Sequence, residues 1–142
     1  MEHTVCFIGH RDVYDEERIR RLLYDAVEQE IKNGAKLFYL GGCGGFDRIA
    51  AGMVWELKRK YPQITSVLVL AYLNKETDTA LYDKTTYPPI ENVPPRFAIS
   101  RRNRWMVDQA DTVIAYVIRD WGGAARTLNY AVRKNKRILL LE

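Results

Sequence analysis

The chain has 142 residues, of which 47% are hydrophobic and 28% are charged, as is typical of one globular domain spanning residues 1–142. It contains no apolar run long enough to cross a bilayer and no leader pattern at its start, so we expect a cytoplasmic protein without membrane contact. The net charge of +4 is concentrated only between Arg96 and Arg104, which favours a local anion site over a nucleic-acid surface.

The two cysteines predict neither a disulfide nor a metal site. Cys6 lies within an apolar strand pattern, whereas Cys43 lies in a glycine-rich loop, so we do not expect them to pair. Together with His3 and His10 they are too few and too scattered to bind zinc. Cys43 is either a small residue in a tight loop or a reactive thiol at a helix N-terminus.

Apolar runs and 3.6-residue periodicity define the expected elements in chain order. Strands are predicted at residues 4–9, 37–40, 64–72, 112–117 and 137–141. Helices are predicted at residues 15–32, from residue 46 to a point before Pro62, and at 99–110 and 124–134. Between residues 74 and 97 the periodicity fails, which predicts either a lid or binding loop, or a short helix near residues 79–84.

Apolar strands that alternate with helices indicate an α/β fold, with a five-stranded parallel sheet between two helical layers. Right-handed crossovers favour the strand order 3-2-1-4-5, numbered along the chain. That order reverses between the first and fourth strands. Ligands of such sheets bind beside the reversal, at the carboxyl ends of the strands.

The most informative segment is the loop after the second strand, which contains Gly41, Gly42, Gly44 and Gly45. Glycines between a strand and a helix let the backbone approach a ligand, and the free N–H groups of the helix attract a phosphate. We therefore predict that Gly44 and Gly45 bind an anion through backbone N–H groups, and that Gly45→Val abolishes binding without unfolding the protein. The alternative is a tight turn without a ligand, in which Asp47 only caps the helix.

Two further glycine turns end strands on the same rim. Gly9-His10-Arg11 follows the first strand, and Gly122-Gly123 follows the fourth. Because the carboxyl ends of parallel strands share one edge of the sheet, these turns converge with the glycine loop and predict a ligand pocket there.

These motifs, together with Arg102-Asn103, Met106-Val107-Asp108 and Thr127, resemble the SLOG superfamily. This is the Rossmann-like group that contains the DNA-processing A proteins and the "lonely guy" cytokinin-activating phosphoribohydrolases. The likeness covers nearly the whole chain and is greatest to small bacterial stand-alone members of unknown function. It implies a Rossmann-like sandwich, a nucleotide or nucleotide-derived ligand at the rim, and a homo-oligomer through the helical faces.

One motif of the phosphoribohydrolases has a different sequence in this chain. Their Pro-Gly-Gly-x-Gly-Thr-x-x-Glu segment, whose glutamate assists N-glycosidic cleavage, corresponds to residues 121–129, where Asn129 replaces the glutamate. An amide cannot act as a carboxylate acid or base, so we assign no catalytic residue and predict a sensor or accessory protein. Two alternatives stay open: an N-glycosidase that uses Asp47 or Asp120, and single-stranded DNA binding by residues 96–104.

The predicted site combines the three glycine turns with polar residues of the later helices. The expected ligand-binding residues are Gly9, His10, Arg11, Gly41, Gly42, Gly44, Gly45, Asp47, Arg102, Asn103, Gly122, Gly123 and Thr127. Arg11, Arg102 and Thr127 each have an alternative interpretation as an ordinary surface residue, and Asp47 is also a candidate for a ribose hydroxyl.

The aromatic residues are assigned by their setting in the pattern. We assign Trp105 and Trp121 to packing, and we regard Tyr82 and Tyr87 as the better candidates for stacking on a base. The expected partner is a small nucleotide derivative, with no metal, no resident cofactor and no nucleic acid.

Overall fold

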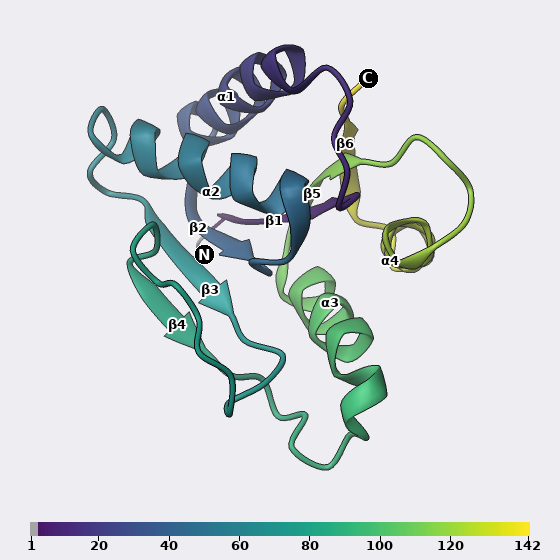
Figure 1. Cartoon of the computed structure of the whole chain (residues 1–142). Coiled ribbons are helices and arrows are strands. Elements are labelled where there is room, and N and C mark those ends of the chain that lie inside the picture. The colour runs from purple at the N-terminus through teal and green to yellow at the C-terminus, as the bar shows by residue number, and fades with distance from the viewer. Residues whose placement is uncertain (1–2) are drawn as a thin grey trace.

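The computed structural model describes residues 3–142 and shows a sheet between two pairs of helices (Figure 1). The strands are β1 (His3–Gly9), β2 (Ala35–Leu40), β3 (Thr65–Val69), β4 (Lys84–Thr86), β5 (Thr112–Tyr116) and β6 (Arg137–Leu140). The α-helices are α1 (Glu16–Lys32), α2 (Gly44–Lys58), α3 (Ala98–Gln109) and α4 (Gly123–Arg133), and a short 3₁₀ helix, η1, spans Pro95–Phe97.

The sheet has six strands in the order β4-β3-β2-β1-β5-β6, and every neighbouring pair is parallel. The α/β class, the parallel sheet and the relative order of the five predicted strands are confirmed. The expected number of five strands is wrong, because β4 adds a sixth strand at the edge beside β3. The order still reverses between β1 and β5, as the ligand-site argument requires.

The segment between residues 74 and 97 is not a single irregular lid. It contains β4 and η1, and no helix forms at residues 79–84. Ala71, Ile90 and Ala98 form a small apolar cluster to one side of the main core, against which Tyr72 and Tyr87 pack. The Tyr72 hydroxyl donates a 2.9 Å hydrogen bond to the Pro95 carbonyl. These contacts fix the path of residues 87–98 into α3.

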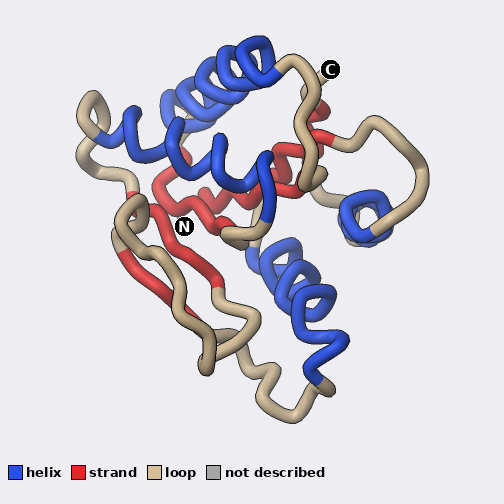
Figure 2. The backbone as a smooth tube through the Cα atoms, in the orientation of Figure 1, coloured by secondary structure: helices blue, strands red, loops and turns tan. Residues whose placement is uncertain are grey.

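Alternate side chains of the central strands build two cores, one on each face of the sheet. In β1, Val5 and Phe7 pack with α1 and α2, whereas Cys6 and Ile8 pack with α3 and α4. Figure 2 shows the same division, with α1 and α2 above the strands and α3 and α4 below them. Strands that are buried on both faces read as continuous apolar runs, which is why the sequence pattern identified them.

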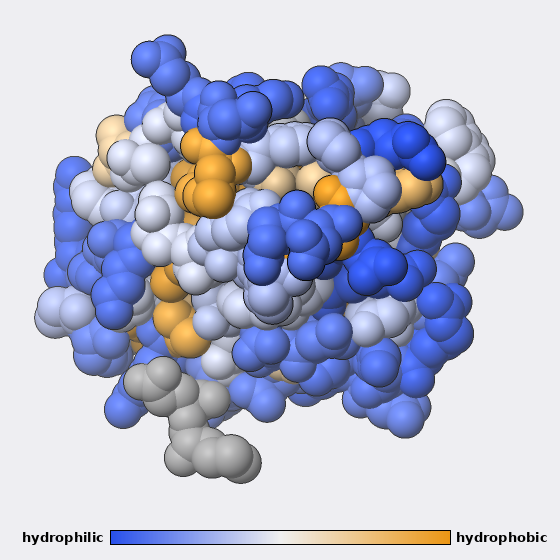
Figure 3. Space-filling model, turned by 90° about the horizontal axis from the view of Figure 1, so that it is seen from below, coloured by the Kyte–Doolittle hydropathy of each residue, from blue (hydrophilic) through white to orange (hydrophobic). Residues whose placement is uncertain are grey.

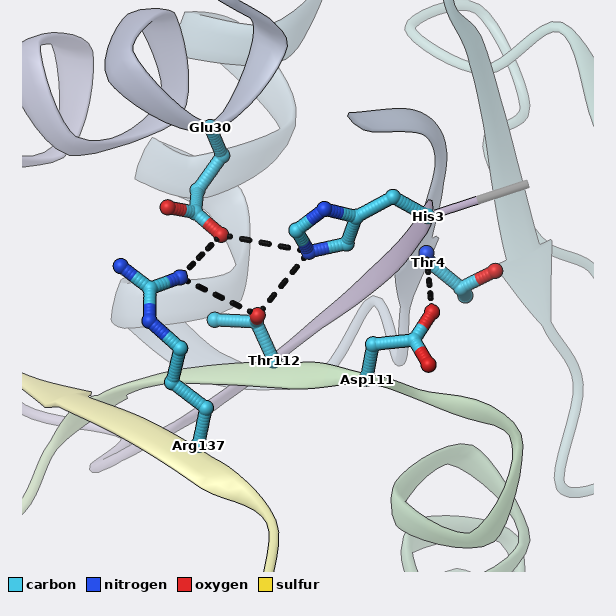
Figure 4. A network of polar contacts seen from close by, with 6 residues as sticks. All are labelled: His3, Thr4, Glu30, Asp111, Thr112 and Arg137. Atoms are coloured by element: carbon cyan, nitrogen blue, oxygen red, sulfur yellow. Dashed lines mark hydrogen bonds and ion pairs between the residues drawn. The ribbon is translucent and has the colours of Figure 1, made fainter. Parts of the chain in front are cut away.

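A polar network lies at the amino ends of β1, β5 and β6 (Figure 4). The Glu30 carboxylate of α1 is fully buried, and its Oε1 lies 2.6 Å from Arg137 Nη1 and 3.4 Å from His3 Nε2. Thr112 Oγ1 lies within hydrogen-bond distance of both His3 and Arg137, and the Thr4 N–H donates a 2.8 Å hydrogen bond to Asp111. This network lies at the opposite ends of the strands from the predicted site.

Within residues 3–142 no helix combines the length and the apolar composition needed to cross a bilayer. The face seen in Figure 3 is covered mainly by hydrophilic residues, and its apolar residues form small separate patches.

Candidate functional site

A cleft of about 250 Å³ lies beyond the carboxyl ends of β1 and β5, where the strand order reverses. Its lining residues are Phe7, Ile8, Gly9, His10, Arg11, Cys43, Asp47, Ile99, Arg102, Asn103, Arg119, Gly123 and Ala124. Three arginines face this space with a single carboxylate, so its charge favours an anion. Seven of the thirteen predicted site residues are among those that line it.

Arg102 is buried, and its hydrogen bonds hold the chain in place where β2 and β3 end. Its Nη1 donates hydrogen bonds of 2.7 Å to the Gly41 carbonyl and 3.0 Å to the Val69 carbonyl, and its Nε donates 2.8 Å to Asn103 Oδ1. It thereby ties the ends of β2 and β3 to α3. Its burial and these hydrogen bonds contradict the alternative interpretation of Arg102 as an ordinary surface residue. No hydrogen bond from Nη2 of Arg102 to residues 3–142 is found, and that group is left for the cleft.

Asp47 lies in the first turn of α2, with only 8% of its surface exposed. Burial raises the pKa of Asp47 to about 6, although the hydrogen bond from the Cys43 N–H, 3.0 Å long, and the charge of Arg102 oppose the change. Gly41 allows this arrangement, because a Cβ there would lie 3.0 Å from Arg102 Cζ and 3.2 Å from Asp47 Oδ2. Asp47 therefore caps its helix, as one interpretation predicted, and also faces the cleft.

His10 is buried at the end of β1 and joins it to the end of β5. Its Nε2 accepts a 2.9 Å hydrogen bond from the Ile118 N–H, which requires that nitrogen to be unprotonated. Burial, and then the nearby charge of Arg119, lower the pKa of His10. The ring also packs edge-on against Tyr116. His10 is therefore a neutral residue of the cleft wall near neutral pH, with Nδ1 as its remaining polar atom.

The N-terminus of α2 does not present both of the donors that the glycine pattern predicted. The helix begins at Gly44, two residues earlier than expected. The Gly45 N–H donates a 2.7 Å hydrogen bond to the Arg11 carbonyl, and the Phe46 N–H donates 3.3 Å to the His10 carbonyl. The assignment of the Gly45 N–H to an anion is therefore wrong in this structure, because the backbone after β1 occupies that donor.

The same packing explains why this segment is rich in glycine. A Cβ on Gly45 would lie 2.5 Å from the Arg11 carbonyl oxygen, and one on Gly44 would lie 2.8 Å from the Arg11 Cα. Gly44 also has a φ of +89°, which favours glycine. Gly42 and Gly44 line a separate hollow with Tyr82 on the other side of the loop. Gly41 and Gly45 do not line the cleft itself.

Arg119 was not predicted and is a central residue of the cleft. Its Nε is buried and has no hydrogen-bond partner within residues 3–142. Its guanidinium carbon lies 4.2 Å from the centre of the Trp121 ring, and Trp121 itself is 65% exposed. Trp121, which was assigned to packing, therefore packs against Arg119 at the surface and not in a core. Arg119 precedes the Gly122-Gly123 turn directly, but nothing in the sequence indicates that its side chain faces inward.

The N-terminus of α4 borders the same cleft through Gly123 and Ala124. No side chain caps this helix and its first turn contains no acid, whereas α2 has Asp47 in its first turn. Gly122 makes the turn with a φ of +94° and does not itself line the cleft. The helix end that is suited to an anion is therefore that of α4.

The remaining predicted residues lie outside the cleft. The buried Thr127 hydroxyl donates a 3.0 Å hydrogen bond to the Gly123 carbonyl, and Thr127 faces an adjoining hollow. Asp120 and Asn129 are exposed and line neither space. Tyr87 packs in the small cluster beside α3, and Trp105 packs against Tyr39, as its assignment to packing predicted.

Comparisons with known proteins identify the fold. No family model matches the sequence, and no curated protein sequence matches it. DNA processing protein A from Helicobacter pylori is 18% identical, with a TM-score of 0.66 over 99% of this chain and 65% of that one. DNA processing protein A from Streptococcus pneumoniae is 15% identical, with a TM-score of 0.69 over 99% of this chain and 50% of that one.

The molybdenum cofactor carrier protein from Chlamydomonas reinhardtii is also similar, with 15% identity and a TM-score of 0.65 over 99% of this chain and 76% of that one. The chain thus spans half to two thirds of the two DNA processing proteins. These structures confirm the resemblance that the motifs indicated, at the level of the fold: the chain has the Rossmann-like fold of SLOG-type proteins.

Proposed function

We infer that this protein binds a nucleotide or a nucleotide-derived ligand in the cleft between β1, β5 and α4. The observation that carries the proposal is Arg119, whose buried Nε has no hydrogen-bond partner among residues 3–142 and which lines the cleft beside Arg11 and Arg102. A buried cationic donor without an acceptor is costly, and a bound anion removes that cost. The uncapped N-terminus of α4 adds a second source of positive potential to the same space.

The nucleotide character of the ligand is supported by the other walls of the cleft. Phe7, Ile8, Ile99 and Ala124 supply apolar surface next to the arginines, as a base or a ribose requires. The site also lies at the switch point of the sheet, where folds of this class bind nucleotides. The likeness to SLOG-type structures agrees with this choice, and the departure at Asn129 supports a binding protein without the hydrolase glutamate.

A second candidate function rests on Asp47. Its carboxyl group lines the cleft and has a pKa of about 6, which suits general acid or base catalysis near neutral pH. Cleavage of an N-glycosidic bond would then use Asp47 in place of the missing glutamate, whereas Asp120 lies outside the cleft. Free base released from nucleoside monophosphates by the parent, and lost in Asp47→Asn, would support this enzyme activity.

The binding proposal is tested by thermal unfolding with AMP, ADP, ADP-ribose and NAD. A ligand present at 100 times its dissociation constant should stabilise the protein by about 2.7 kcal/mol. Arg119→Met should lose that response, because it keeps the bulk beside Trp121 and removes the charge and the donors. Arg101→Met is the matched control, since Arg101 is exposed on α3 and lines no part of the cleft.

Two outcomes would contradict the proposal. The first is the absence of any stabilisation by these ligands up to millimolar concentration. The second is binding of an oligothymidylate that Arg119→Met leaves unchanged, because it would place the nucleic-acid contacts elsewhere. Such binding would resemble the Helicobacter pylori protein, whose structure concerns single-stranded DNA binding.

A further inference from the structure

A second hollow of about 210 Å³ adjoins the cleft and shares Ile99, Asn103 and Gly123 with it. Its other lining residues are Arg96, Ser100, Arg104, Arg126 and Thr127. We call this space the basic hollow, because three of its eight lining residues are arginines and none is acidic. It lies between α3 and the start of α4, with Gly123 on the boundary between the two spaces.

The three arginines of the basic hollow are not neutralised by the protein. None of them forms an ion pair with a carboxylate within residues 3–142. Two of them are held against aromatic rings, with the guanidinium of Arg104 5.1 Å from the Tyr130 centroid and that of Arg96 4.7 Å from the Phe97 centroid. A ring face orients a guanidinium without using its N–H donors, so these donors remain available for an anion.

Other surface hollows lack this character. The hollow beside Tyr82 is lined by one cation, Arg48, and one carboxylate, Asp78. The groove over β2, β3 and β4 is lined by Lys36 and Lys84 with several threonines and apolar residues, and it does not share a residue with the cleft. Only the basic hollow, among these spaces within residues 3–142, continues the positive lining of the cleft past the N-terminus of α4.

We propose that the basic hollow is a second phosphate subsite, so that the ligand of the cleft carries at least two phosphate groups. This inference rests on the proposed function and narrows its ligand class to nucleoside di- and polyphosphates, bisphosphates and dinucleotides. One phosphate lies against Arg119 in the cleft, and the next lies among Arg96, Arg104 and Arg126. The start of α4 is positioned between them and faces both.

The test is isothermal titration with AMP, ADP, ADP-ribose and adenosine 3′,5′-bisphosphate. The parent should bind at least one of the two-phosphate ligands at least tenfold more tightly than AMP. Tighter binding of the bisphosphate would indicate that the ribose separates the two bound phosphates. Tighter binding of ADP or ADP-ribose would indicate that the two phosphates are joined directly. In the triple variant Arg96→Met, Arg104→Met, Arg126→Met, the affinity for the two-phosphate ligands should fall to that for AMP. The affinity for AMP itself should stay within twofold of the parent value.

The controls separate this inference from the function on which it rests. Arg101→Met removes one exposed charge from α3 outside both spaces and should change none of the affinities more than twofold. Equal affinity for AMP and every two-phosphate ligand would overturn the second subsite while leaving the nucleotide site in place. Equal weakening of AMP and two-phosphate ligands in the triple variant would also overturn it.

Two further results are informative. If the parent binds none of the four compounds, both the function and the subsite are wrong. If it binds an oligothymidylate more tightly than any of them, and the triple variant loses that binding, the basic hollow belongs to a nucleic-acid path. The single variants of the three arginines guard against misfolding of the triple variant, since each should lower two-phosphate affinity by itself.

Discussion

The carbonyl oxygen of Arg11 accepts a 2.7 Å hydrogen bond from the N–H of Gly45. This contact joins the turn after β1 to the first turn of α2. The Gly45 N–H, which the sequence assigned to a ligand, is therefore used within the protein. Gly44 and Gly45 are needed because the backbone of Arg11 approaches them, whereas a Cβ on Gly41 or Gly42 would meet the side chains of Arg102 and Leu68. The anion site that we propose accordingly lies elsewhere on the rim, at Arg119 and the start of α4.

The first prediction concerns this contact. Gly45→Ala places a Cβ 2.5 Å from the Arg11 carbonyl oxygen, so the turn and the helix must separate. Overpacking of this kind costs about 1–3 kcal/mol, which should lower the melting temperature by several degrees. Gly52→Ala is the matched control in the same helix, because its Cβ meets nothing within 4 Å. It should stabilise α2 by about 0.5–1 kcal/mol through helix propensity. Equal melting temperatures for the two variants would contradict this account.

The second prediction concerns the pH dependence of stability. The pKa of Asp47 is raised from 3.8 to about 6, so the folded state binds its proton more tightly than the unfolded state. The contribution of Asp47 to the free energy of unfolding is therefore greatest below pH 4. It falls as the pH rises to 6 and is constant above that. The lowered pKa of His10 acts in the opposite direction, because stability from His10 is lost as the pH falls below its ordinary value of 6.5.

The effect of Asp47 is isolated by comparison with Asp47→Asn, in which His10 is unchanged. The variant should be more stable than the parent at pH 7 by roughly 2–3 kcal/mol, and the difference should vanish towards pH 4. Urea denaturation of both proteins between pH 4 and pH 8 measures it. A difference that does not vary with pH would show that Asp47 does not titrate in this range.

The third prediction uses the two cysteines as reporters. Cys6 is fully buried and burial raises its thiol pKa strongly, whereas Cys43 is exposed at the cleft. Iodoacetamide should therefore modify one cysteine, Cys43, in the folded protein, as peptide mass spectrometry can verify. A saturating nucleotide ligand should slow that modification at least tenfold. An unchanged rate with a ligand that is shown to bind would place the ligand away from Cys43.

The fourth prediction concerns the polar network of Figure 4. Arg137→Met leaves the fully buried Glu30 carboxylate with only His3 nearby, and its Oε2 already has no hydrogen-bond partner within residues 3–142. Removing the cation that faces a buried carboxylate should cost roughly 1–3 kcal/mol, because the Arg137 side chain itself is half exposed and gains little from desolvation. The double variant Arg137→Met, Glu30→Met should recover most of that loss, since no charge is then buried. Arg18→Met, an exposed arginine of α1, controls for the change of charge.

Sequence pattern located most of the fold because β1, β3 and β5 are buried on both faces and therefore read as apolar runs. It missed β4 for a physical reason. Lys84, Thr85 and Thr86 contain no apolar alternation, and their strand exists only because β3 offers an open edge with which they pair. Tertiary context of this kind leaves no local signal.

The sequence predicted a ligand site at the rim where the structure has a cleft, but it did not indicate which groups line that cleft. A run of glycines indicates that something approaches the backbone closely, and it does not indicate whether that is a ligand or another part of the chain. Arg119 carries no motif at all, and its role follows from the turn of the chain between β5 and α4 that directs it inward. Arg102 was found through the family resemblance, yet its hydrogen bonds to Gly41 and Val69 serve the scaffold as well as the site.

The central position of β1 has a consequence for how the protein is made. The Thr4 N–H donates a hydrogen bond to Asp111, 107 positions later, and Val5 to Gly9 of β1 pair with β5 on that side. At roughly 5–20 residues per second of synthesis, β1 waits on the order of 5–20 s for this neighbour after it leaves the ribosome. The two halves of the cleft, one after β1 and one after β5, are separated by the same delay. The residues that line the cleft are therefore not all present until the last quarter of the sequence has been synthesised, and until then the edge of β1 that faces β5 has no partner strand.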